Sequence, residues 1–152
     1  MGNVAELRRM TAEEFLEWDR TQTIRHEFVD GEVYAVSGAG IAHNMAAGNL
    51  YLSLRGHLAG SSCRTFQTDV KLKVEAVGNF YFPDLIVTCS PADASDLYIV
   101  REPTLLVEVL SPSTQRLRPR GQVRGLPPPA HFERVPARRS GGAALRSLPQ
   151  EC

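Results

Sequence analysis

The 152-residue sequence predicts a domain of the α/β (α+β) class, in which helices flank a mixed β-sheet. Three observations predict this class. Two segments have the length and apolar spacing of helices, an Asp-Gly pair separates two β-rich runs, and four further runs have the composition of strands.

The first two predicted elements are a short helix and a hairpin. Thr11 and Glu14 have the spacing of a capping box, in which each side chain bonds to the backbone amide of the other residue, and they predict a helix over 11–19. Asp30 and Gly31 then lie between two β-rich runs. Because a two-residue hairpin turn needs positive φ at both central positions, this pair predicts a tight hairpin.

One longer helix and a series of strands follow. Residues 42–58 carry Met and Leu at helical spacing among small and polar residues, which predicts a helix. The strand-like runs are 64–67, 69–74, 81–88 and 104–110, with a polar loop before the last of them. The run 69–74 alternates polar and apolar residues, as a strand with one wet face does. Residues 85–88 are apolar on both faces and are predicted to lie inside the sheet.

Charge and composition divide the chain near residue 114. Residues 1–114 carry 9 basic and 15 acidic side chains, a net charge of −6, whereas residues 115–152 carry 8 Arg and 2 Glu, a net charge of +6. The second segment also holds 6 of the 10 prolines and has neither helical nor strand periodicity. We therefore predict a folded domain over 1–114 and a disordered Arg/Pro/Gly-rich tail over 115–152.

Several classes of protein are disfavoured. No apolar run approaches the roughly 18 residues of a membrane span, so we expect no membrane protein. The N-terminus lacks the basic-then-apolar layout of a signal peptide. The three cysteines, Cys63, Cys89 and Cys152, are an odd number without metal-like spacing, which favours a reducing cytoplasm over a disulfide framework.

Two carboxylates stand in apolar strand sequence. Asp84 opens one apolar run, and Glu108 lies in the middle of another. A lone ionised carboxylate is costly to bury, so it is normally paired or coordinates a metal. Together the two acids predict a site for Mg²⁺ (or Mn²⁺), which binds one or two carboxylates, water and substrate phosphate. Structural ion pairs with Arg64, Arg101 or Lys71 are the alternative, and the physics alone leaves both open.

These acids stand in sequence blocks that resemble a known family. Phe-Pro-Asp-Leu-Ile-Val at 82–87 and Leu-Val-Glu-Val-Leu at 106–110 look like the two halves of the PD-(D/E)XK nuclease motif. More narrowly, five blocks in order, over residues 10–114, resemble the stand-alone restriction endonuclease domains of the Uma-two family. The blocks are 26–32, 43–50, 69–71, 82–87 and 107–114. The resemblance implies a restriction-endonuclease-like sheet flanked by helices and Mg²⁺-dependent hydrolysis of DNA phosphodiester bonds.

The resemblance also implies the site residues. Asp84 matches the aspartate of the motif and Glu108 its acidic partner, so these two are the expected metal ligands. Glu27 matches an acidic residue contributed early in the family, which is expected to hold a metal-bound water or to complete the shell. An exposed hairpin charge is the alternative role for Glu27.

Three other block residues are expected to lie outside the chemistry. Asp69 and Lys71 could reach the site from one strand face, but we expect them to be solvated strand charges. His43, near a helix start, is expected to be a helix-start hydrogen-bonder rather than a ligand or base. The implied partner is DNA, and a homodimer is possible because many nucleases of this superfamily dimerise, although no residue identifies an interface.

One residue departs from the motif. A lysine is expected two residues after Glu108, where Leu110 stands, or in the narrower family from the helix after 111–114, yet no lysine follows Lys73. Such a lysine would orient the attacking water and offset transition-state charge. A one-base shift of the reading frame can turn residues 116–136 into AYDRGAKFAAYRRPPTSSEYL, which supplies the lysine. We therefore hypothesise a frameshift near residue 115 or 116. It would truncate the domain at its C-terminus, leave a strand edge uncovered and impair the activity.

Two other functions stay open at this point. The Arg-rich tail can be taken at face value as a nucleic-acid-binding arm on a non-catalytic domain, although it lacks the interleaved aromatic residues of single-strand binders. The domain can also be a small interaction module whose buried acids are merely paired. Divalent-metal binding distinguishes both from the nuclease.

Overall fold

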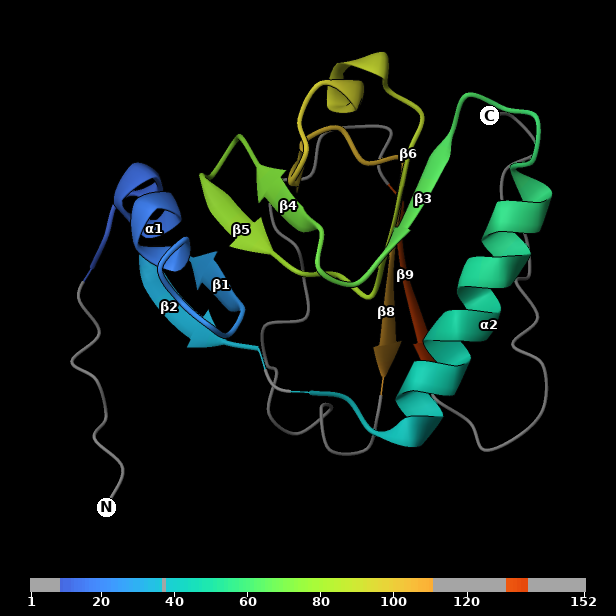
Figure 1. The fold of residues 1–152 in the computed structure, drawn as a ribbon, viewed down its shortest axis with the longest axis horizontal. Coiled ribbons are helices and arrows are strands. Elements are labelled where there is room, and N and C mark those ends of the chain that lie inside the picture. The colour runs from blue at the N-terminus through green and yellow to red at the C-terminus, as the bar shows by residue number, and fades with distance from the viewer. Residues whose placement is uncertain (1–8, 37, 111–130, 137–152) are drawn as a thin grey trace.

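The computed structural model describes residues 9–36, 38–110 and 131–136, which form two α-helices and two β-sheets (Figure 1). The elements in chain order are α1 (Ala12–Asp19), β1 (His26–Val29), β2 (Glu32–Ala35), α2 (Ile41–His57), β3 (Arg64–Gln67), β4 (Lys71–Val74), β5 (Asn79–Tyr81), β6 (Leu85–Thr88), the 3₁₀ helix η1 (Pro91–Ala94), β7 (Ile99–Val100), β8 (Leu105–Leu110) and β9 (His131–Pro136). Sheet A has the strand order β2-β1-β5-β4-β7, and sheet B has the order β3-β6-β8-β9. The predicted α+β class is confirmed.

Local sequence signals determine α1 and the first hairpin. The Thr11 hydroxyl accepts a hydrogen bond from the Glu14 backbone N–H at 3.2 Å, and Glu14 Oε2 accepts one from the Thr11 N–H at 2.8 Å. Asp30 and Gly31 have φ angles of 53° and 86°, and they join the antiparallel strands β1 and β2. The predicted capping box and the predicted turn are therefore confirmed.

The run predicted as one strand over 81–88 is two strands in different sheets. β5 ends at Tyr81 and pairs with β1 and β4 in sheet A, whereas β6 begins at Leu85 and lies between β3 and β8 in sheet B. Pro83 stands between them, and a proline has no N–H to donate to a strand ladder. The chain therefore bends at 82–84 and changes sheet, which places Asp84 on the bend.

The segment predicted as a polar loop, between β6 and β8, contains η1 and the short strand β7, which runs parallel to β4. The buried Asp93 carboxylate accepts hydrogen bonds from the Thr88 hydroxyl at 2.7 Å and the Arg101 N–H at 2.8 Å. Arg101 also donates a hydrogen bond to Asp96, which lowers the pKa of that carboxyl below its ordinary value. These bonds fasten the loop to the end of sheet B.

Part of the segment predicted as a disordered tail forms a strand. β9 runs parallel to β8 along its whole length, from the pair Leu105–His131 to the pair Leu110–Pro136. The expectations of disorder and of an open β8 edge are thus wrong for these residues. The unpaired backbone groups of an edge strand can bond to any extended segment, whatever its side-chain pattern. The remainder of 115–152 lies outside the described residues.

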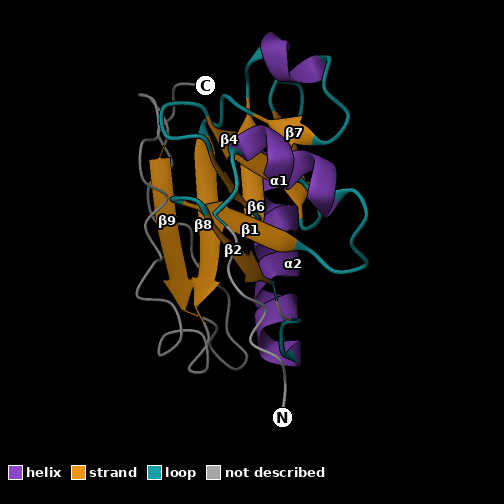
Figure 2. Cartoon of the chain, turned by 90° about the vertical axis from the view of Figure 1, so that its left-hand side faces the viewer, coloured by secondary structure: helices purple, strands orange, loops and turns teal. Residues whose placement is uncertain are grey.

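Three apolar clusters hold four layers together: α1, sheet A, sheet B and α2 (Figure 1). Phe15, Phe28 and Phe80 pack between α1 and sheet A. A second cluster, which includes Leu72 and Leu106, fills the space between the sheets. The third joins sheet B to α2, so that α1 and α2 lie on opposite sides of the strands (Figure 2). Neither described α-helix has the length and apolar content to cross a membrane.

Cys63 and Cys89 form a disulfide, contrary to the expectation of reduced cysteines. Cys63 precedes β3 and Cys89 follows β6, and the pairing of Arg64 with Thr88 puts the two cysteines opposite each other, with their Cα atoms 4.0 Å apart. Sequence spacing could not reveal this bond, because it does not show which strands pair. The cysteines therefore no longer support the cytoplasmic location, which stays a prediction.

We expect reduction of this disulfide to lower the free energy of unfolding by about 3 kcal/mol, because it frees a loop of 26 residues in the unfolded chain. Urea unfolding with and without a thiol reductant measures the difference. Cys63→Ser should have the lower stability with and without the reductant. Cys152→Ser should still lose stability when the reductant is added. Superimposable curves for the unchanged chain would contradict the expectation.

Candidate functional site

Asp84 lies on the bend before β6, beside β8, and its side chain is 17% exposed. Its Oδ2 accepts hydrogen bonds from the backbone N–H of Val109 at 2.7 Å and from Nε2 of His43 at 3.1 Å. Its Oδ1 accepts none from the described residues. Within the described ranges, two donors therefore hold one carboxylate oxygen, and the other oxygen has no donor.

Glu108 lies across from Asp84 on the neighbouring strand. The antiparallel register of β6 and β8, continued by one residue, puts the two acids opposite each other. The hydrogen bond from the Val109 N–H to Asp84 agrees, since that nitrogen is bonded to the carbonyl carbon of Glu108. Leu106 packs between the sheets, and the alternation along β8 puts the half-buried Glu108 on the same face. The backbone register thus puts the two predicted metal ligands at opposite positions.

Glu27 reaches the same bend from sheet A. Its Oε1 accepts a hydrogen bond from the backbone N–H of Phe82 at 3.1 Å. Phe28 packs against α1, whereas Val29 packs against the cluster between the sheets, so alternation along β1 directs Glu27 toward sheet B. Glu27 is half-buried and is not an exposed hairpin charge. Glu27 is therefore bonded to the same bend that carries Asp84.

Asp69 and Lys71 each form an ion pair with a residue other than these acids. Asp69 is 78% exposed and pairs with Arg25 at 2.9 Å, so it is the solvated charge that was expected. For Lys71 that expectation is wrong, because its side chain is only 14% exposed and its Nζ pairs with Asp19 Oδ2 at 2.5 Å. Lys71 lies on the α1 side of sheet A, opposite to Glu27.

The cations considered as structural partners of the acids each have another partner among the described residues. Lys71 pairs with Asp19, Arg64 donates to the carbonyl of Ser90, and Arg101 pairs with Asp96 and Glu75. None of the three pairs with Asp84 within the described ranges. In the same ranges, no three His, Cys, Asp or Glu side chains are grouped to hold a metal. An ion at Asp84 would therefore need oxygen ligands from water or substrate as well.

No lysine accompanies the acids in the described part of the chain. Leu110 ends β8 at the position where the motif has its lysine. Lys71 is bound to Asp19, and Lys73 pairs with Glu75 at 2.8 Å. Residues 111–130, where the family would place its lysine-bearing helix, lie outside the described residues.

His43 has a partner that sequence reasoning did not identify. Its ring lies in the first turn of α2 and bonds through Nε2 to Asp84, 41 residues away. The expected role as a helix-start hydrogen-bonder is wrong, because the ring bonds to Asp84 and not to the start of its own helix. The N-cap residue of α2 is Gly40, which has no side chain to cap the helix. The signal in the sequence was that His43 stands one turn before the buried Ala47, on the same helix face.

A family comparison decides where the chain belongs. The model of the Uma2 family, described as "Putative restriction endonuclease", matches residues 12–122. The chain belongs to the Uma2 family. The resemblance expected over 10–114 is confirmed, and the match to Uma2 extends past the point at which the charge of the chain changes sign.

Individual proteins are similar to this Uma2 chain. Two come from Synechocystis sp.: "Uncharacterized protein slr1290" is 36% identical over 107 residues, and "Uncharacterized protein sll1609" is 30% identical over 112 residues. The aligned residues make up 70% and 72% of this chain but only 56% and 63% of those relatives, so the chain spans about three-fifths of their length.

A solved structure shares the fold of this Uma2 chain. It is a "putative nuclease belonging to DUF820" from Anabaena variabilis, with a TM-score of 0.58 and 16% identity. The match covers 71% of this chain and 64% of that one. At this identity the likeness concerns the fold, and the predicted restriction-endonuclease-like architecture is confirmed.

Proposed function

We propose that this Uma2 chain is a Mg²⁺-dependent endonuclease domain that hydrolyses DNA phosphodiester bonds, with activity reduced by the loss of the lysine-bearing helix. The observation that carries the proposal is that Asp84, on the bend before β6, and Glu108, on β8, stand at opposite positions of the strand register. Glu27, bonded to the same bend, supplies a third acid from the other sheet. Membership of the Uma2 family supports this class of reaction.

The residues fit Mg²⁺ or Mn²⁺. These ions prefer oxygen ligands, and Mg²⁺ is commonly held by one or two carboxylates, with water and substrate phosphate completing its shell. Asp84 would contribute Oδ1, the oxygen that accepts no hydrogen bond from the described residues. Glu108 would contribute the second carboxylate, and a cage of three protein ligands is not required.

The acids have two kinds of task in the proposed reaction. When bound, a divalent cation lowers the pKa of water and neutralises charge on a phosphoryl oxygen. Asp84 and Glu108 hold the negative charge that attracts the cation between two buried strands. Glu27, which accepts the Phe82 N–H, would orient the attacking water or complete the shell. Without a lysine beside them, transition-state charge lacks one donor.

Calorimetric titration of the full chain with Mn²⁺ tests the proposal. We expect one binding site, which is lost in both Asp84→Ala and Glu108→Ala because each variant removes one of two ligands. Asp69→Ala is the matched control, since that carboxylate is 78% exposed and pairs with Arg25. Absence of binding, or binding that survives both variants, would favour the non-catalytic nucleic-acid-binding or interaction module.

A further inference from the structure

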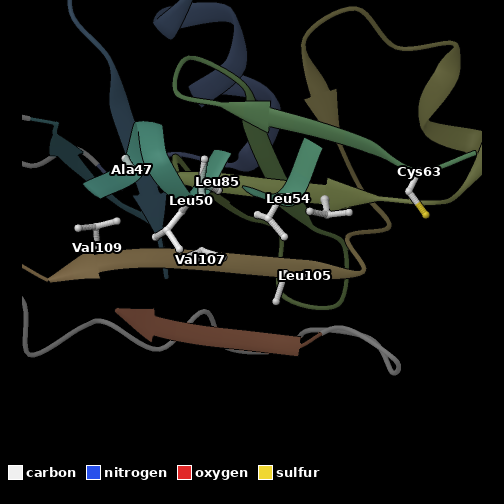
Figure 3. Packing of buried hydrophobic residues seen from close by; sticks show 9 residues of the cluster. Ala47, Leu50, Leu54, Cys63, Leu85, Leu105, Val107 and Val109 are labelled. Atoms are coloured by element: carbon white, nitrogen blue, oxygen red, sulfur yellow. The ribbon is translucent and has the colours of Figure 1, made fainter. Parts of the chain in front are cut away.

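His43 lies on the face of α2 that packs against sheet B. Ala47, Leu50 and Leu54 follow it at helical spacing and are buried against β6 and β8. Figure 3 shows these three side chains in a row on the side of β8 that carries Val107 and Val109. His43 stands one turn before Ala47, so it continues this row past the apolar contacts, to the bend that holds Asp84. The polar His43 ring therefore lies at the end of the apolar contact between α2 and sheet B.

The His43 ring and the Val109 amide hold the same oxygen of Asp84. Their distances to Oδ2 are 3.1 Å and 2.7 Å, and the His43 side chain is 11% exposed. To donate to a carboxylate, the imidazole must carry a proton on Nε2. Two donors on one oxygen restrict rotation of the carboxylate, because a turn about its Cβ–Cγ bond breaks both hydrogen bonds. Oδ1 then keeps one direction relative to β8.

We propose that His43 is a positioning residue, which orients the Asp84 carboxylate so that Oδ1 faces a divalent cation. This inference rests on the proposed function. His43 acts through Asp84, since its Nε2 is directed at the carboxylate oxygen and not at an open ligand position. Hydrogen bonds to a metal-ligating group change metal affinity by about 10- to 100-fold. The Val109 donor is a backbone N–H. Of the two donors to Asp84 Oδ2, a substitution can therefore remove only the His43 side chain.

Mn²⁺ calorimetry on three variants of α2 tests the role. His43→Leu removes the donor and keeps the helix folded, because leucine continues the apolar row. We expect its dissociation constant to rise by about 10-fold or more. His43→Gln can place an amide N–H near the same oxygen, and it should restore the affinity to within about threefold. His57→Ala, on the exposed end of α2, should leave the affinity unchanged.

The outcomes separate this inference from the proposed function. If Asp84→Ala abolishes binding while His43→Leu binds Mn²⁺ normally, the positioning role is overturned and the metal site stands. If Asp84→Ala binds Mn²⁺ as tightly as the unchanged chain, the metal site itself fails. Equal loss in His43→Leu and His43→Gln would make the ring a direct ligand, which also contradicts the positioning role. Thermal melts of each variant verify that it is folded.

Discussion

Restoring the shifted reading frame over residues 116–136 should raise Mg²⁺-dependent DNA cleavage by about 10²- to 10³-fold, the usual effect of one transition-state donor. The restored segment carries a lysine, whereas the described residues offer none beside Asp84 and Glu108. Cleavage of supercoiled plasmid by equal concentrations of the two chains measures the change. Equal rates would mean that the lysine is unnecessary.

Two controls isolate the cause of this gain. A restored chain in which the new lysine at position 122 is methionine keeps the added segment and should return to the low rate. The nucleotide sequence of the gene tests the frameshift independently, because in each shifted codon only the wobble base is free. If the bases after codon 115 do not encode the lysine-bearing segment in another frame, the frameshift hypothesis fails.

Leu54→Ala should lower the free energy of unfolding by about 2–5 kcal/mol, which is a large part of the about 5–15 kcal/mol that a typical domain has. Leu54 is 0% exposed and packs in the cluster that joins α2 to sheet B, so its truncation leaves a cavity there. Leu52→Ala is the matched control, since Leu52 lies two positions earlier in α2 and is 69% exposed. Its unfolding free energy should change by less than about 0.5 kcal/mol.

Urea unfolding of both leucine variants measures this difference. A similar loss of stability in the two variants would contradict the packing of α2 on sheet B, because only one of the leucines contacts that sheet. The comparison also bears on the site. His43 lies on the same helix, so a poorly packed α2 would release the Asp84 carboxylate from one of its two donors.

Features that depend on neighbouring residues could be predicted from the sequence. The capping box of α1 and the Asp30-Gly31 turn need only residues within a few positions, and their hydrogen bonds and φ angles are as expected. The apolar run of β6 predicted a fully buried strand, and all its residues are buried. Asp84 and Glu108 could be predicted as site residues because a charge in an apolar run is costly to bury unless it is paired or binds a metal.

Features that depend on which strands meet could not be predicted in this way. The division of 81–88 between two sheets follows from how sheets A and B stack, and sequence spacing contains no such information. Cys63 and Cys89 come together only because β3 pairs with β6. β9 pairs with β8 through backbone groups, which every residue has. The sequence of this segment therefore needed no strand-like alternation, and none marked it as a strand. His43 showed its helical position but not the carboxylate that it meets.

A crystal structure of the full chain grown with Mn²⁺ tests the shared metal site most directly. We expect an anomalous peak about 2.1 Å from a carboxylate oxygen of Asp84 and from one of Glu108, the separation typical of small divalent cations. His43 should remain bonded to the other oxygen of Asp84. A structure in which the two carboxylates point apart, or in which an arginine fills the space between them and no peak is present, would contradict the shared metal site.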